Sequence, residues 1–211
     1  MTTERVLVVP VQELEKQGIT PQDILQQIDV CKLDSQAYGY LPRHVIDDKS
    51  PKSVEAGKLY PQVLPYNLLI DVNTKSVLVY QRKGKEEGLL GKWSLGVGGH
   101  ITDEDSVEMG ITSITDLIAV GATREFVEET GLMSDILVDD YTRCILSYRD
   151  LTSTVHLGLV SFIEVEDFSE LDLAPSEFLN YGWMTLQELK DSDKEWETWS
   201  DIIIKSLTNE F

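Results

Sequence analysis

The 211-residue chain lacks long apolar runs, and no stretch approaches the roughly 20 apolar residues that a membrane span needs. Residues 1–10 hold a short apolar run without the longer apolar region and small-residue cleavage site of a secretory signal. We therefore expect a cytoplasmic protein that does not use a membrane as a partner.

Cysteine and histidine are also scarce. The two cysteines, Cys31 and Cys144, are far apart in the sequence and form neither a disulfide framework nor a metal-ligand spacing. The three histidines, His44, His100 and His156, are scattered as well. These counts argue for reduced thiols and against a zinc site.

Positive charge is the third scarce feature, because 18 Lys and Arg residues face 37 Asp and Glu residues for a formal net charge of −19. Such a surface repels a nucleic-acid backbone and anionic lipid. The charge therefore disfavours long nucleic acids, and we expect none as a partner. A small phosphorylated ligand remains compatible, since a bound divalent cation can dominate the local charge.

The chain does contain a regular series of strand and helix patterns. They predict a mixed sheet covered by helices, the α/β class, with an N-terminal extension over residues 1–62 packed on a core domain over residues 63–211. Residues 34–60 and 101–110 are expected to be irregular. Strands are predicted over residues 5–9, 64–71, 76–80, 93–97, 142–147, 154–165 and 181–184, and helices from Thr20-Pro21 and over 113–130, 186–190 and 196–207.

Three glutamates lie near the end of the predicted helix 113–130. Glu125, Glu128 and Glu129 are spaced i, i+3 and i+4, so they share one side of the helix within an arc of roughly 80°. Carboxylates at this spacing repel one another and suit a hard cation such as Mg²⁺, and the adjacent Arg124 can orient them. The helix macrodipole disfavours acids at this end. The alternative is a solvated acidic helix end.

The segment Arg124–Leu132 reads REFVEETGL. It resembles the second half of the Nudix box, R-E-U-x-E-E-x-G-U with U apolar, at all nine positions. The first half of that box is G-x5-E-x7. Gly110, five residues, Asp116 and seven further residues lead to Arg124, with Asp116 where the family has Glu. The chain therefore resembles the Nudix hydrolases from Gly110 to Leu132.

Two interpretations of the first half of the box stay open. In the family the box glycine belongs to a Gly-Gly pair after a strand, and here that pair is Gly98-Gly99. An insertion over residues 101–110 would then make the match of Gly110 accidental. Asp116 is either the first acid of the box or part of the capping box Ser113-x-x-Asp116 that begins the helix.

The resemblance implies a Nudix-like α/β/α sandwich with a mixed sheet. It implies a hydrolase that uses Mg²⁺ or Mn²⁺ to cleave a diphosphate linkage in a small phosphorylated substrate, such as a nucleoside diphosphate joined to another group. Carried over to this chain, Glu125, Glu128 and Glu129 are metal ligands or support the base, and Arg124 orients them. The carbonyl of Gly99 is a further metal ligand.

Three residues outside the box are secondary candidates. The resemblance suggests Glu177, which precedes the last predicted strand, as an additional metal ligand. His100 and Arg82 are candidates for binding substrate phosphate. The alternative for Glu177 is a solvated loop acid. The alternatives for His100 and Arg82 are a structural histidine and part of a charged loop.

Two other functions occur on this fold. A Nudix-fold module that binds a ligand or regulates without turnover is favoured only by the departure at Asp116. Isomerisation of an isoprenoid diphosphate expects a catalytic cysteine near the glycine turn, and Gly98-Gly99-His100 has none. Family resemblance also makes a homodimer a possibility.

Overall fold

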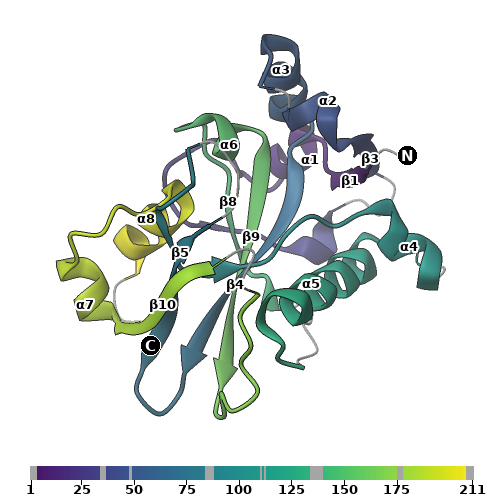
Figure 1. The fold of residues 1–211 in the computed structure, drawn as a ribbon. Coiled ribbons are helices and arrows are strands. Elements are labelled where there is room, and N and C mark those ends of the chain that lie inside the picture. The colour runs from purple at the N-terminus through teal and green to yellow at the C-terminus, as the bar shows by residue number, and fades with distance from the viewer. Residues whose placement is uncertain are drawn as a thin grey trace.

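The computed structural model describes residues 4–33, 37–47, 49–83, 88–109, 111, 113–133, 140–174 and 178–207. Its centre is a mixed sheet in which the long strands β4 and β9 run parallel and the other pairs run antiparallel (Figure 1). The strand order is β10-β5-β4-β9-β8-β2, and β1, β3, β6 and β7 pair off this path. The strands are β1 (Arg5–Val8), β2 (Gln26–Gln27), β3 (Gly39–Pro42), β4 (Gln62–Asp71), β5 (Ser76–Arg82), β6 (Trp93–Ser94), β7 (Gly96–Val97), β8 (Arg143–Ile145), β9 (His156–Val165) and β10 (Phe178–Thr185).

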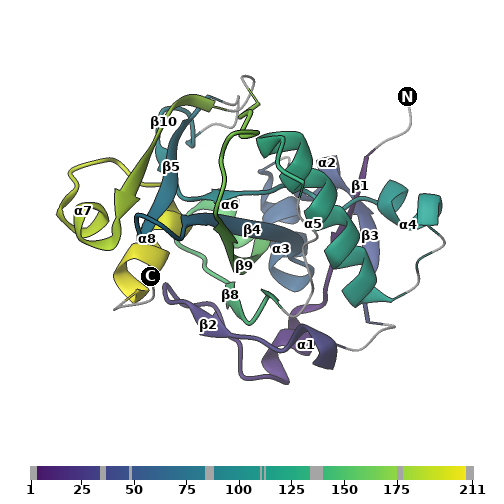
Figure 2. The same ribbon diagram turned by 90° about the horizontal axis from the view of Figure 1, so that it is seen from below.

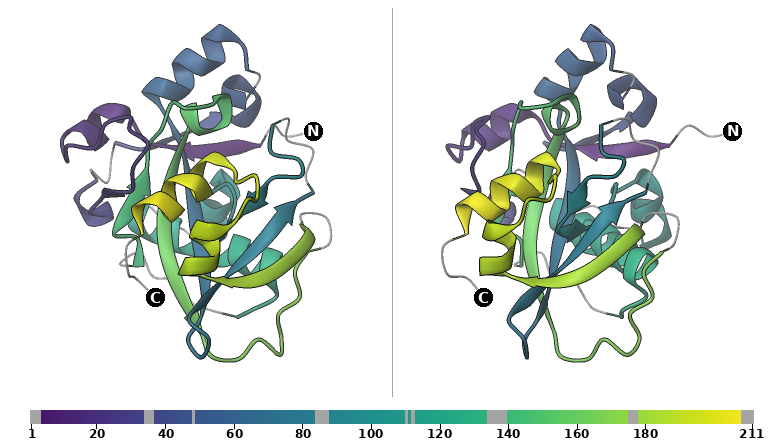
Figure 3. Two further views of the ribbon diagram at one scale, coloured as in Figure 1. Left: turned by 90° about the vertical axis from the view of Figure 1, so that its left-hand side faces the viewer. Right: turned by 60° about the vertical axis from the view of Figure 1, so that its left-hand side comes forward.

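Helices cover both faces of this sheet. Helix α5 (Ile114–Thr130) lies on one face, and α7 (Leu186–Asp191) and α8 (Thr198–Ser206) lie on the other (Figures 2 and 3). The alternation along β4 explains the two layers, because Leu69 packs in the cluster of Phe126 from α5, whereas Leu68 packs in that of Ile203 from α8. The fold is therefore an α/β/α sandwich, as predicted.

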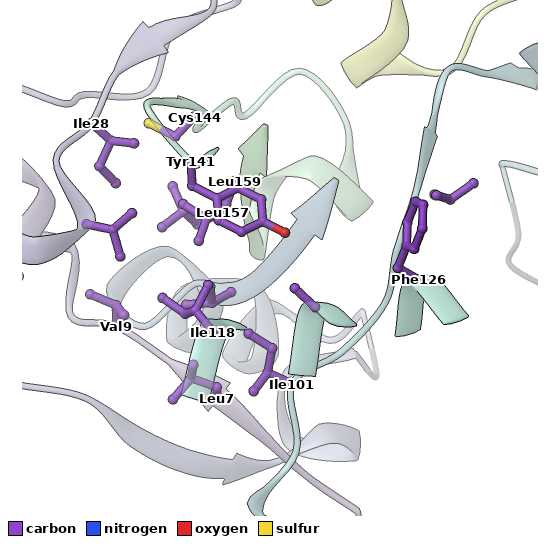
Figure 4. Packing of buried hydrophobic residues seen from close by; sticks show 14 of the residues in the cluster. Leu7, Val9, Ile28, Ile101, Ile118, Phe126, Tyr141, Cys144, Leu157 and Leu159 are labelled. Atoms are coloured by element: carbon purple, nitrogen blue, oxygen red, sulfur yellow. The ribbon is translucent and has the colours of Figure 1, made fainter. Parts of the chain in front are cut away.

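The N-terminal residues share the core on the α5 face. They form β1, α1 (Val11–Glu15), β2, the 3₁₀ helix η1 (Val30–Lys32), β3, α2 (Arg43–Asp47) and α3 (Pro51–Leu59). Leu7 belongs to the same buried cluster as Ile101 and Ile118, and Figure 4 shows these three side chains close together. The division of the chain near residue 62 remains a proposal, since β4 itself begins at Gln62.

Three segments differ from the sequence prediction. No helix begins at Thr20-Pro21, because Gln26 hydrogen-bonds the backbone of Thr20 in both directions and then pairs with Cys144 of β8. The segment expected to be irregular after residue 34 holds β3, α2 and α3, the last of them capped by Ser50. The expected loop 101–110 contains α4 (Asp103–Met109), whose first-turn acids suit a helix N-terminus.

The other predicted elements are confirmed within one to three residues at most ends. They are β1, the β4–β5 hairpin, the strand before the glycine turn, α5, β8, β9, β10, α7 and α8. None of the helices in the described ranges is both long and apolar enough to cross a membrane.

Candidate active site

The C-terminal end of α5 is fixed by backbone hydrogen bonds. Gly131 ends the helix in the left-handed conformation, with φ of 71°. The carbonyl of Thr130 accepts a bond of 2.8 Å from the N–H of Asp172, and the carbonyl of Glu129 accepts one of 3.0 Å from Ala174. The loop before β10 therefore satisfies the last turn of the helix and holds its acids in place.

A glycine turn follows β7 and meets two of these acids. The N–H of Gly98 donates to Oε2 of Glu129 at 2.8 Å. A Cβ at Gly99 would lie 2.4 Å from Oε2 of Glu125, so a side chain there would push that carboxylate away. The turn can approach α5 this closely because glycine has no side chain.

Arg124 joins the carboxylates to a second acidic residue. Its Nε and Nη2 donate to the two carboxylate oxygens of Asp105 at 2.7 and 3.0 Å, a bidentate pair. Its Nη1 donates to Glu125 at 2.8 Å and to Glu128 at 3.4 Å, and Nη2 also donates to the carbonyl of His100 at 2.9 Å. The hydrogen bonds that Arg124 donates to Asp105 and Glu125 raise the pKa of its guanidinium, so it stays charged.

Asp105 was not singled out by the sequence analysis, although its spacing contains a signal. Gly99, five residues and Asp105 repeat the G-x5-acid spacing, and Asp105 is buried. Asp116, by contrast, is exposed, and Ser113 makes no side-chain capping bond to the helix that it precedes. Asp105 is therefore an acid upstream of α5 that contacts the box arginine, and an insertion separates it from Arg124. Gly110 lies outside the described residues.

A pocket of about 300 Å³ opens beside the turn and α5. It brings together Glu125 and Glu129 with the predicted Gly99, His100 and Arg82. Glu128 is not among its described lining residues, and Glu177 lies outside the described residues. The pocket is lined by Glu4, Arg43, Leu64, Tyr66, Arg82, Leu89, Gly98, Gly99, His100, Glu125, Glu129, Asp150, Thr152, Ser153, His156, Glu197, Thr198 and Trp199.

Burial shifts the pKa of two groups in this pocket. It raises the pKa of Glu125, and the charges of Glu128 and Asp105 add to that shift, while Arg124 opposes it. Burial also lowers the pKa of His100 well below its usual range, and His156 beside it adds to that shift. The two imidazole Nε2 atoms are 3.4 Å apart, within reach of a hydrogen bond in which one nitrogen donates and the other accepts.

The described pocket residues have the donor atoms that suit a hard divalent cation, but their side chains are not already arranged around a metal position. Among the described residues, no group of three Asp, Glu, His or Cys side chains is close enough to hold a metal ion. The carboxylates of Glu125 and Glu129 and the backbone of Gly99 nevertheless present the oxygen donors that Mg²⁺ and Mn²⁺ prefer. Burial disfavours the charged form of Glu125, and a bound cation would offset this cost.

The sequence of this chain is similar to a family model and to a known protein. A family model, NUDIX domain, matches residues 66–207. Protein YmaB of Bacillus subtilis (strain 168) is 26% identical over 153 residues, which are 70% of this chain and 71% of that protein.

Solved structures are similar at the level of the fold. The crystal structure of Tm1382, a protein assigned to the Nudix hydrolases, superposes with a TM-score of 0.69 at 23% identity. That similarity covers 96% of this chain and 97% of Tm1382. A NUDIX hydrolase from Alicyclobacillus acidocaldarius has a TM-score of 0.48 at 15% identity, covering 69% of this chain and 90% of that one.

Proposed function

This chain belongs to the Nudix family, and from that premise we propose that it is a divalent-cation-dependent hydrolase of diphosphate linkages. The substrate class that we favour is a small phosphorylated compound, in particular a nucleoside diphosphate joined to another group. Pocket size supports this choice, since about 300 Å³ suits a small molecule and not a polymer.

The observation that carries this proposal is the bidentate hydrogen-bonded pair between Arg124 and Asp105 beside the glycine turn. This pair holds the guanidinium so that its Nη1 reaches Glu125. Glu125 is thereby kept at the pocket wall next to Gly99. A solvated acidic helix end does not require a buried aspartate to position its arginine.

We assign Mg²⁺ or Mn²⁺ to Glu125, Glu128, Glu129 and the carbonyl of Gly99, where it would supply charge neutralisation for the diphosphate. Arg124 orients Glu125 and Glu128 through its Nη1. One carboxylate of this group accepts the proton of the attacking water.

Two further residues of the pocket lining contact the substrate in this proposal. Arg82 pairs with a phosphoryl oxygen. The imidazole of His100, which also lines the pocket, adds a hydrogen bond.

The test is product release from a panel of nucleotides and nucleotide-linked diphosphates with Mg²⁺, with Mn²⁺ and with EDTA. We expect cleavage of one substrate class that EDTA abolishes. Glu128→Gln should abolish turnover and leave folding nearly intact, because the Glu128 side chain is 59% exposed. Normal Mg²⁺-dependent rates in that variant would exclude the role of Glu128. A folded protein that cleaves nothing in the panel would instead favour a binding or regulatory module.

A further inference from the structure

Two residues from the N-terminal part of the chain line the same pocket as Glu125. Glu4 immediately precedes β1 and Arg43 begins α2, which follows β3. Because β1 and β3 pair antiparallel from Arg5 opposite Pro42, Glu4 and Arg43 are brought side by side, and the N–H of Arg43 donates to the carbonyl of Glu4 at 2.9 Å. Both lie outside residues 66–207, the part of the chain that matches the family.

The charges of the pocket lining indicate why Arg43 matters for binding an anion. Five of the described lining residues are carboxylates, namely Glu4, Glu125, Glu129, Asp150 and Glu197. Only Arg43 and Arg82 among those lining residues carry a permanent positive charge. A diphosphate has more negative charge than one arginine can balance, and in a chain with 18 Lys and Arg against 37 Asp and Glu the overall charge repels an anion.

Arg43 is anchored on one edge of its guanidinium. Its Nε donates to Oδ2 of Asp47 at 2.9 Å, and Oδ1 of Asp47 accepts from the amide of Gln62 at 2.6 Å. Gln62 is fully buried in β4, so this chain of bonds ties the arginine to the sheet. The guanidinium plane is therefore fixed before any ligand arrives.

A weaker contact lies on another edge. The Nη1 of Arg43 donates to Oε2 of Glu4 at 3.3 Å, longer than the bond to Asp47, and the side chain of Glu4 is 47% exposed. An exposed ion pair of this kind contributes little, so a better anion can replace the carboxylate. Arginine binds phosphate oxygens through two parallel N–H bonds, which a partly solvated carboxylate at 3.3 Å does not match.

We propose that Arg43 is a substrate-binding residue supplied by the N-terminal part of the chain, and that a phosphoryl group of the substrate replaces Glu4 on its guanidinium. The ligand class, a diphosphate, rests on the proposed function. Glu4 occupies the arginine until the substrate binds and repels anions that cannot displace it.

A purely structural role for Arg43 predicts a different pattern of substitutions. Removing either partner breaks the same ion pair, so Glu4→Gln and Arg43→Gln would then change the protein in the same direction. A binding role predicts opposite signs, because Glu4→Gln removes a competitor and a repulsive charge, whereas Arg43→Gln removes the donor.

The experiment is calorimetric titration of the full chain with methylenediphosphonate, a diphosphate that is not hydrolysed, with Mg²⁺ and with EDTA. We expect Arg43→Gln to raise Kd roughly tenfold or more, the range for a lost hydrogen bond to a charged group. Glu4→Gln should lower Kd, and Arg43→Lys should be intermediate because it keeps the charge without the fork. Arg5→Gln is the matched control, since Arg5 is a neighbouring exposed arginine outside the pocket lining.

Thermal unfolding of each variant shows whether it is folded. If Arg43→Gln does not fold, Glu4→Gln and Arg43→Lys carry the test, and wild-type affinity in both overturns the proposal. It is also overturned if Arg43→Gln binds as tightly as Arg5→Gln, if Glu4→Gln weakens binding, or if the wild-type chain binds no diphosphonate. The hydrolysis panel is scored separately. Cleavage without a need for Arg43 overturns this inference alone, and Arg43-dependent binding without cleavage overturns the proposed hydrolysis alone.

Discussion

At the residue scale, Asp105 and Asp116 offer a direct comparison between two acids of similar sequence spacing. Asp105 is buried and holds Arg124 through two hydrogen bonds, whereas Asp116 is exposed. We expect Asp105→Asn to lower the free energy of unfolding by about 3 kcal/mol, because it removes the bidentate charged partner of a partly buried arginine. Turnover should fall with it, since Arg124 then no longer orients Glu125.

Asp116→Asn is the matched control for that variant. An exposed acid away from special contacts changes stability by about 0.5 kcal/mol or less. Urea unfolding of both variants measures the stability, and initial rates on the cleaved substrate measure the turnover. Equal effects of the two substitutions would contradict the assignment of Asp105.

Gly99 provides a second test at this scale. In Gly99→Ala the new methyl group would meet the carboxylate of Glu125 at 2.4 Å, so the flexible end of that side chain must move. Stability should change little, because a flexible side chain can yield. We expect kcat to fall by about 10²-fold, the loss that a shift of about 1 Å in a reacting group can cause. Steady-state kinetics beside thermal unfolding separates the two effects, and an unchanged kcat would argue against Glu125 at the reaction centre.

At the scale of elements, the sequence predicts what local signals specify. Helix α5 has a glycine stop and a motif along its last turns, and β4 and β5 are joined by turn residues, so both were predicted. Strand β2 was not, because its two glutamines become a strand only by pairing with β8. Helix α4 was not predicted either, because its acidic composition is typical of a surface loop, although acids also suit the first turn of a helix.

The residues of the candidate site likewise divide into those that local sequence patterns mark and those that only tertiary packing brings to the pocket. Glu125, Glu129 and Gly99 could be found because a motif and a glycine pair mark them in the sequence. Arg43 and Glu197 could not be found, since each reaches the pocket only through packing between segments far apart in the chain. Glu197 also caps the N-terminus of α8, because its carboxylate accepts hydrogen bonds from the backbone N–H groups of Trp199 and Ser200. No local sequence pattern predicts this cap.

The C-terminus of α5 makes a prediction at the element scale. Gly131 has φ of 71°, and a Cβ there would lie 3.2 Å from Cβ of Asp172 and 3.3 Å from the carbonyl of Glu170. Gly131→Ala should therefore cost about 1–2 kcal/mol, the usual strain of a left-handed residue with a side chain. Denaturant unfolding measures it, with Gly182→Ala on β10 as a control because nothing lies within 4 Å of its Cβ position. A loss no larger than in the control would contradict the role of this helix stop.

At the scale of the whole molecule, one core joins the N-terminal residues to the family domain. Strand β1 pairs with β3 and touches β4 at Val8 opposite Gln62. The N–H of Leu7 donates to the carbonyl of Ile101 at 2.8 Å, directly behind the glycine turn. The N-terminal part thus contacts the residues that follow the glycine turn, and its Arg43 lines the pocket.

This arrangement predicts that residues 63–211 alone do not fold cooperatively. The deletion removes eight buried side chains of the α5-face cluster: Leu7, Val9, Val11, Leu14, Ile19, Ile28, Val30 and Leu33. At about 2 kcal/mol for each buried aliphatic side chain, their loss equals or exceeds the roughly 5–15 kcal/mol that keeps a domain folded. We expect broad thermal unfolding and strong binding of a hydrophobic dye, against a sharp transition in the full chain. A sharp transition in the truncated chain would show instead that residues 1–62 only pack on an independently stable domain.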